Sequence, residues 1–88
     1  MLYTPQIREA VDKIRVPKDF VVDVVEYNMY PAFIALRFYE SQWVAFTEPE
    51  RLVCARYLSA IKNIIESFGV PVTLEPVSDV MQNVQPAI

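Results

Sequence analysis

Histidine and cysteine, the side chains that most often carry out catalysis or bind metals, are nearly absent from this sequence. The chain contains no histidine and a single cysteine, Cys54. Without histidine there is no Ser-His or Cys-His nucleophile pair and no usual metal ligand, and one cysteine cannot build a structural zinc site. We therefore expect no catalytic, cofactor-binding or metal-binding residue in this chain, and we interpret Cys54 as a buried thiol.

Carboxylates remain as candidates for acid–base chemistry. Asp23 and Glu26 are three residues apart in an expected strand, so their side chains point to opposite faces. Glu48 and Glu50 suit the start of a helix, where the helix dipole favours negative charge. The single glycine, Gly69, excludes a glycine-rich phosphate loop, and we predict neither an enzyme nor a small-molecule ligand.

Aromatic side chains and one arginine form the most informative pattern in two predicted strands. Tyr27, Phe33 and Tyr39, with Arg37, can make a stacking platform of the kind with which sheet domains bind single-stranded nucleic acid. The other interpretation is that they pack beneath the N-terminal helix or against another protein chain. The net charge of −3 and the isoelectric point near 4.8 favour the second interpretation, because nucleic acids and anionic membranes attract basic proteins.

Composition indicates one small domain. Of the 88 residues, 53% are apolar and 12% aromatic, which is too apolar for a disordered chain. A domain of this size has much surface for its volume, so some apolar side chains are expected to remain outside the core. The lone cysteine permits no internal disulfide and favours a reducing compartment, so we expect a cytoplasmic protein. The longest uncharged stretch, Tyr27–Leu36, is too short to span a membrane.

Two helices are predicted from their start signals. Thr4-Pro5 opens a short helix, since threonine is a good N-cap and proline is tolerated at the first helical position. Its apolar stripe is Ile7, Val11 and Ile14, and Val16-Pro17 is expected to end it.

The second helix is longer and carries the clearer signal. Thr47-Glu48-Pro49-Glu50 fits a capping box, in which each of the two outer residues satisfies a backbone N–H of the other. The helix is predicted from about Glu48 to Phe68, with Gly69 just after its end. Its apolar face consists of Cys54, Tyr57, Leu58, Ile61, Ile64, Ile65 and Phe68.

Four strands are predicted around the long helix. Residues 20–27, 32–39 and 42–46 are expected to form a three-stranded antiparallel meander with short connections. Residues 70–75 are predicted as a short edge strand, because Pro71 and Pro76 bracket it. Residues from about 77 to 88 are expected to form a frayed tail, in which Ser78 can cap a last turn through Val84.

The predicted fold is therefore α+β. It consists of a short N-terminal helix, the meander, the long amphipathic helix on one sheet face and the short C-terminal edge strand. The face of Trp43 depends on the connection at Glu40-Ser41. A two-residue turn places it beside Phe38 on the helix side, and a loop one residue longer places it on the other face.

The two faces of the first two strands differ in character. If the turn centres near Tyr30, Val22 pairs with Phe38 and Val24 with Leu36 on the face toward the long helix. On the other face Asp23 falls opposite Arg37, Val25 opposite Ala35 and Tyr27 opposite Phe33, so the two charges become cross-strand partners. This second face is largely apolar, and either the N-terminal helix or another chain must cover it.

These observations predict a small non-enzymatic protein that binds a protein partner and self-associates as a homodimer. An accessory or inhibitory protein, such as one encoded by a phage, fits this profile. The alternative function is binding of single-stranded nucleic acid by the sheet aromatics and Arg37. The predicted partner-binding residues are Asp23, Val25, Tyr27, Phe33, Arg37 and Tyr39.

Overall fold

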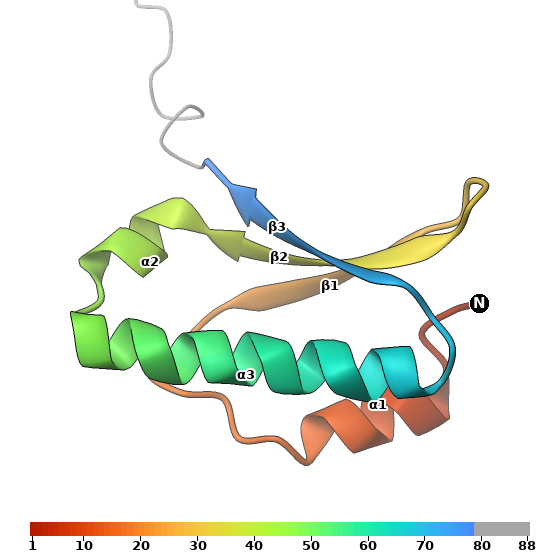
Figure 1. Ribbon diagram of the computed structural model, residues 1–88, viewed down its shortest axis with the longest axis horizontal. Coiled ribbons are helices and arrows are strands. Elements are labelled where there is room, and N and C mark those ends of the chain that lie inside the picture. The colour runs from red at the N-terminus through yellow and green to blue at the C-terminus, as the bar shows by residue number, and fades with distance from the viewer. Residues whose placement is uncertain (79–88) are drawn as a thin grey trace, which may run out of the picture.

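Within residues 1–78, three strands form one sheet, and two helices lie on the same face of it (Figure 1). The computed structural model of the chain describes residues 1–78. The tail expected from about residue 77 to 88, with its turn from Ser78 through Val84, lies outside the described residues except for Ser78 and for Val77, which belongs to the last strand. In chain order, the elements are α1 (Pro5–Asp12), β1 (Val22–Tyr27), β2 (Phe33–Tyr39), α2 (Glu40–Ala45), α3 (Glu48–Ser67) and β3 (Val72–Val77).

The first helix, α1, begins as predicted and ends earlier. The Thr4 hydroxyl accepts a hydrogen bond from the Ile7 N–H at 3.4 Å, and Pro5 is the first helical residue. The expected end at Val16 is wrong. The Ile14 N–H donates to the Val11 carbonyl, only three residues back, at 3.0 Å, and this tighter turn closes the helix.

The long helix, α3, confirms its predicted start. The Glu50 N–H donates to the Thr47 hydroxyl at 3.4 Å, and the Thr47 N–H donates to the Glu50 carboxylate at 2.8 Å. Cys54, Leu58, Ile61 and Ile65 form its buried face. The prediction that Phe68 belongs to this face is wrong, because the helix ends at Ser67 and the Phe68 side chain is 50% exposed.

The hairpin of β1 and β2 has the predicted register. Asp23 pairs with Arg37, and Val22, Val24, Val25 and Tyr27 all meet their expected partners on the antiparallel strand. Ile34 and Leu36 are fully buried toward the helices. The register therefore places the apolar residues of even number in the core and those of odd number on the opposite face.

The predicted third meander strand does not form. Residues 40–45 make the short helix α2, and the sheet is mixed, because β3 pairs with β2 in parallel. Trp43 and Phe46 lie three residues apart and both contact the Phe20 ring, with centroid distances of 6.0 Å. Helical spacing lets both rings reach the core, whereas a strand would point them to opposite faces.

Phe20 is the centre of an aromatic cluster at this end of the core. Its buried ring also contacts Phe38 at 6.0 Å and Tyr57 at 6.3 Å. Trp43 contacts Phe38 as well, at 5.7 Å. Trp43 therefore lies on the helix side of the sheet, although it arrives there from a helix and not from a strand.

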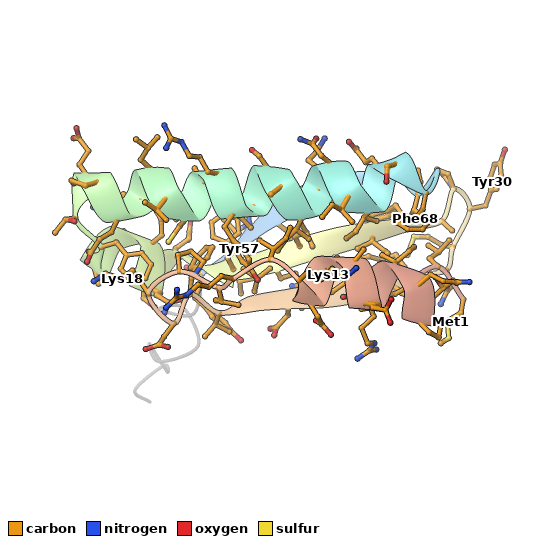
Figure 2. All side chains as sticks on the ribbon, turned by 90° about the horizontal axis from the view of Figure 1, so that it is seen from below. Met1, Lys13, Lys18, Tyr30, Tyr57 and Phe68 are labelled. Carbon is orange, nitrogen blue, oxygen red and sulfur yellow. The ribbon has the colours of Figure 1, made fainter. Side chains whose placement is uncertain are left out.

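Both helices that pack on the sheet lie on the same side of it. Figure 2, seen from that side, shows α3 and α1 next to each other in front of the strands. Ile7 and Val11 of α1 join the α3 residues and Ile34 in one core cluster. The N-terminal helix thus does not cover the second face of the sheet, which was one of the two possibilities that the sequence left open.

Candidate functional site

The sheet face that points away from α1 and α3 is the candidate site, and we call it the open face. No helix or strand of residues 1–78 lies across it (Figure 1). Alternation along each strand assigns its residues, since their neighbours point into the core. They are Asp23, Val25 and Tyr27 of β1, Phe33, Ala35, Arg37 and Tyr39 of β2, and Thr73, Glu75 and Val77 of β3. All six predicted partner-binding residues lie here.

An aromatic pair occupies one end of the open face. The rings of Tyr27 and Phe33 are stacked, with centroids 4.8 Å apart and planes inclined by 20°. They are directly opposite each other in the hairpin register. Cross-strand aromatic pairs of this kind stabilise a sheet and present flat apolar area to a partner.

A row of three charged side chains crosses the open face. The registers place Asp23 of β1, Arg37 of β2 and Glu75 of β3 side by side. The Arg37 Nε lies 2.8 Å from a Glu75 carboxylate oxygen, an ion pair without a well-aligned hydrogen bond. The sequence predicted Asp23 as the partner of Arg37, and the register agrees, but the ion pair is made with Glu75.

This ion pair is a surface interaction. The Arg37 and Glu75 side chains are 39% and 42% exposed, and pairs as exposed as this contribute about 0–1 kcal/mol. Two carboxylates flank one guanidinium, so the row carries a net charge of −1. The ion pair of Glu75 with Arg37 could not be predicted from the sequence, because no residue near Glu75 in the chain indicates that β3 lies parallel to β2.

The apolar residues of the open face shield one another. Val25, Tyr27, Phe33 and Tyr39 are each half-buried although no described element covers them, and Ala35 between them is fully buried. Ala35 lies between Val25 of β1 and Thr73 of β3 in the sheet. These side chains form an apolar part of the sheet surface, and such a surface suits a macromolecule better than a small ligand.

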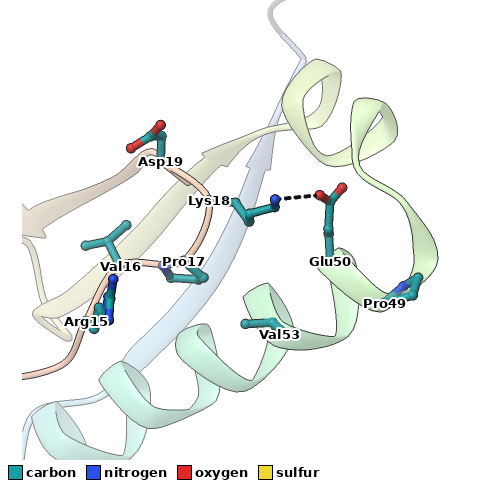
Figure 3. Close-up of a pocket in the computed structure, with 8 residues that line it drawn as sticks. All are labelled: Arg15, Val16, Pro17, Lys18, Asp19, Pro49, Glu50 and Val53. Carbon is teal, nitrogen blue, oxygen red and sulfur yellow. Dashed lines mark ion pairs between the residues drawn. The ribbon is translucent and has the colours of Figure 1, made fainter.

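A groove lies at the other side of the molecule. It has a volume of about 620 Å³ and lies between the loop that precedes β1 and the start of α3 (Figure 3). Its lining residues are Arg15, Val16, Pro17, Lys18, Asp19, Pro49, Glu50 and Val53. Sequence reasoning missed this groove, because Val16-Pro17 indicated only the end of a helix.

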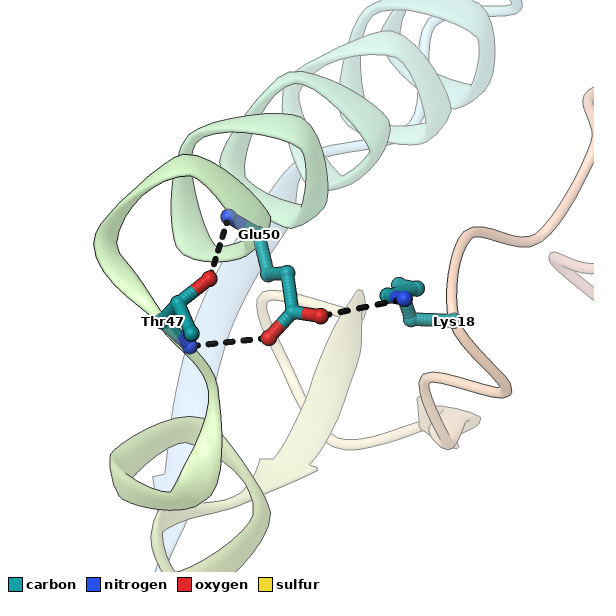
Figure 4. Close-up of polar contacts among 3 residues, drawn as sticks. All are labelled: Lys18, Thr47 and Glu50. Carbon is teal, nitrogen blue, oxygen red and sulfur yellow. Dashed lines mark hydrogen bonds and ion pairs between the residues drawn. The ribbon is translucent and has the colours of Figure 1, made fainter.

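Lys18 and Glu50 fasten this loop to the helix. Lys18 Nζ lies 3.0 Å from a Glu50 carboxylate oxygen, and Figure 4 shows the same carboxylate bonded to Thr47. The hydrogen bond from the Thr47 N–H, with a further contribution from Lys18, lowers the pKa of the Glu50 carboxyl below its usual value. The Glu50 carboxylate in this groove therefore already bonds to Lys18 and to the start of α3.

Chemically reactive groups are sparse in the rest of the described chain. Cys54 is fully buried, and burial raises the pKa of its thiol. Within residues 1–78, no three side chains among histidine, cysteine, aspartate and glutamate gather in an arrangement that could hold a metal ion. None of the helices in that part of the chain has the length and apolar content needed to cross a bilayer.

Comparison of the chain with protein-family models, with curated proteins and with solved structures finds no match in any of the three.

Proposed function

We propose that this is a non-enzymatic binding protein that holds a protein partner on the open face. The observation that supports the proposal is a sheet whose two packed helices share one side. This leaves Val25, Tyr27, Phe33 and Tyr39 of the other side without a cover from residues 1–78. Aromatic residues on a flat surface are the side chains that contribute most to protein–protein affinity.

The charged row indicates what such a partner would offer. Arg37 is paired with Glu75, whereas Asp23 is exposed and makes no ion pair with any residue from 1 to 78. A lysine or arginine of the partner, placed over Asp23, would match the net negative charge of the row. The expected partner surface is therefore apolar with a basic group near its edge.

The same row weighs against nucleic acid as the ligand. A stacking platform for single strands needs a cation that is free to meet a phosphate, and Arg37 already faces Glu75 at 2.8 Å. A phosphate above the row would also meet the Asp23 carboxylate. We therefore propose protein binding in preference to nucleic-acid binding.

The proposal can be tested with a displayed library of random peptides. Peptides selected on the wild-type protein are measured against a double variant, Val25→Thr with Val77→Thr, which makes the open face more polar at nearly constant shape. The matched control is Val44→Thr on α2, where the side chain is 68% exposed and does not belong to the open face. We expect the double variant to bind about tenfold more weakly and the control to bind like the wild type.

The contribution of the Asp23 carboxylate to binding can be measured separately. Asp23→Asn is expected to weaken the same peptides most at low salt, because screening removes the electrostatic part at high salt. Equal affinity for the wild type and the double variant would contradict the proposal. Binding of labelled single-stranded DNA at low salt that disappears in Arg37→Gln would favour the nucleic-acid alternative instead.

A further inference from the structure

The two outer strands of the sheet differ in the backbone groups that they leave unpaired. The Ile34 N–H donates to the Pro71 carbonyl at 2.9 Å, so the backbone N–H and C=O groups of the even-numbered residues of β2 point toward β3. These groups alternate in direction along a strand, and those of the odd-numbered residues of β2 therefore point toward β1. Their partners on β1 are Asp23, Val25 and Tyr27.

It follows that Val22, Val24 and Glu26 point their N–H and C=O groups away from the sheet. The Gln42 side chain supports this assignment, since it accepts from the Val21 N–H at 2.9 Å and donates to the Asp19 carbonyl at 3.0 Å. Both contacts are with odd-numbered residues on the β2 side. Among residues 1–78, no strand lies beside the outer edge of β1.

The outer edge of β3 is protected by its sequence, and the edge of β1 is not. By the same alternation, the backbone N–H and C=O positions of Val72, Leu74 and Pro76 point away from β2, and we call these three the outward residues of β3. Proline has no N–H, and it is a common means of blocking pairing at a sheet edge. The strand β1 contains no proline and no lysine, so its edge keeps all three outward N–H groups.

We propose that β1 pairs antiparallel with β1 of a second copy of this chain, forming a continuous six-stranded sheet. A two-fold axis through Val24 places Val24 opposite Val24 of the partner subunit and Val22 opposite Glu26 of the partner subunit. Only this register uses all three outward positions on both copies, and it forms about six backbone hydrogen bonds.

Charge supports the same register. On the open face it places Asp23 opposite Val25 of the partner subunit, so no two carboxylates meet. Moving the axis to Asp23 would oppose two aspartates directly, which destabilises a strand pair. The two-fold axis is perpendicular to the sheet, and the two open faces therefore lie on the same side of the dimer.

This inference uses the edge of the sheet, and it stands or falls separately from the function proposed for the open face. The test is to remove one of the three outward N–H groups of β1. Val24→Pro deletes the Val24 N–H and leaves the backbone hydrogen bonds to β2 in place. The matched control is Leu74→Pro, because Leu74 and Val24 both flank Leu36 on the same side of the sheet, and Leu74 is an outward residue of β3.

Sedimentation at high micromolar concentration is expected to show a dimer for the wild type and for Leu74→Pro, and a monomer for Val24→Pro. A monomeric wild type would overturn the inference. A dimer that survives in folded Val24→Pro, or that is lost in Val77→Thr, would overturn it as well. Val77→Thr changes the open face on β3 and leaves the edge of β1 intact.

Amide hydrogen exchange of the wild type tests the inference without any variant. The N–H groups of Val22, Val24 and Glu26 are expected to be protected at high concentration and to lose their protection on dilution. The N–H groups of Asp23 and Val25, bonded within the monomer, serve as the internal control. Equal exchange at both concentrations would show that β1 has no partner strand.

Discussion

Glu50 joins two separate parts of this chain. Its carboxylate closes the capping box at the start of α3 and also forms the ion pair with Lys18 in the loop before β1. Lys18 and Asp19 adopt the left-handed conformation, with φ values of 52° and 54°. Non-glycine residues adopt this conformation at a cost, and the ion pair helps to hold the loop that contains them.

The acid sensitivity of folding is expected to depend on Glu50. Because its pKa is lowered in the folded protein, its contribution to stability is complete above the usual value of 4.5 and is lost as the pH falls below that value. Glu50→Gln should therefore lower the melting temperature at pH 7, and the difference from the wild type should shrink toward pH 3.

Thermal melts across this pH range provide the measurement. Glu48→Gln is the control, since Glu48 lies in the same first turn but outside the capping box. A difference between the wild type and Glu50→Gln that stays constant from pH 7 to pH 3 would be inconsistent with this role.

Cys54 is expected to be unreactive in the folded protein. The thiolate is the reactive form, and burial of Cys54 both blocks access and raises the pKa of its thiol. A disulfide reagent should label Cys54 of the native protein only at the rate at which the fold opens and exposes the thiol. It should label the unfolded protein at once. Val53→Cys combined with Cys54→Ala moves the thiol to an exposed position and should be labelled immediately. Rapid labelling of the folded wild type would contradict the prediction.

Among the helices, α3 holds the core together along its whole length. Ile61 is 1% exposed and packs with residues of α1 and the sheet. Ile61→Ala is expected to lower the free energy of unfolding by ~2–5 kcal/mol, through lost burial and the cavity that remains. Leu52→Ala, on the same helix at a site 54% exposed, should change it by no more than ~0.5 kcal/mol. Urea unfolding measures both, and similar values would mean that the buried face of α3 is assigned wrongly.

The helices could be predicted because their signals are local. Thr4 and Thr47 each accept a hydrogen bond from an N–H three residues away, and Pro5 and Pro49 each stand at the start of a helix. The end of α1 was less accessible, since it depends on a tighter turn at Ile14 that no residue type demands. The start of each of these helices is marked by particular residue types, threonine and proline, whereas the end of α1 is set by the path of the loop that follows it.

The wrong prediction of a strand at residues 42–46, where the structure has α2, also has a physical reason. Residues 42–46 contain aromatic and β-branched side chains that favour a strand when they are read alone. In the fold, two carbonyls at the end of this segment are held by Arg51, which donates to Trp43 at 3.0 Å and to Val44 at 3.0 Å. That support comes from the next helix, and a short window of sequence cannot contain it.

At the scale of the whole molecule, the placement of both packed helices on one face is what leaves the candidate site open. The hairpin register was predictable, because Asp23 and Arg37 are the only charged residues of β1 and β2 that lie on the open face. The position of the site followed from that register. The contribution of Glu75 did not, since it requires β3 to lie parallel to β2, and this contact joins distant parts of the chain.

The parallel pairing of β2 and β3 has a consequence for protein synthesis. β3 follows β2 only after both α2 and α3, so the ribosome releases the hairpin and the long helix before β3 exists. During that interval the edge of β2, with Ile34, Leu36 and Phe38 as its outward residues, has no partner strand. An unpaired apolar edge readily pairs with other chains. The nascent protein is therefore most prone to aggregation just before its last described strand emerges, and β3 protects the sheet as well as completing it.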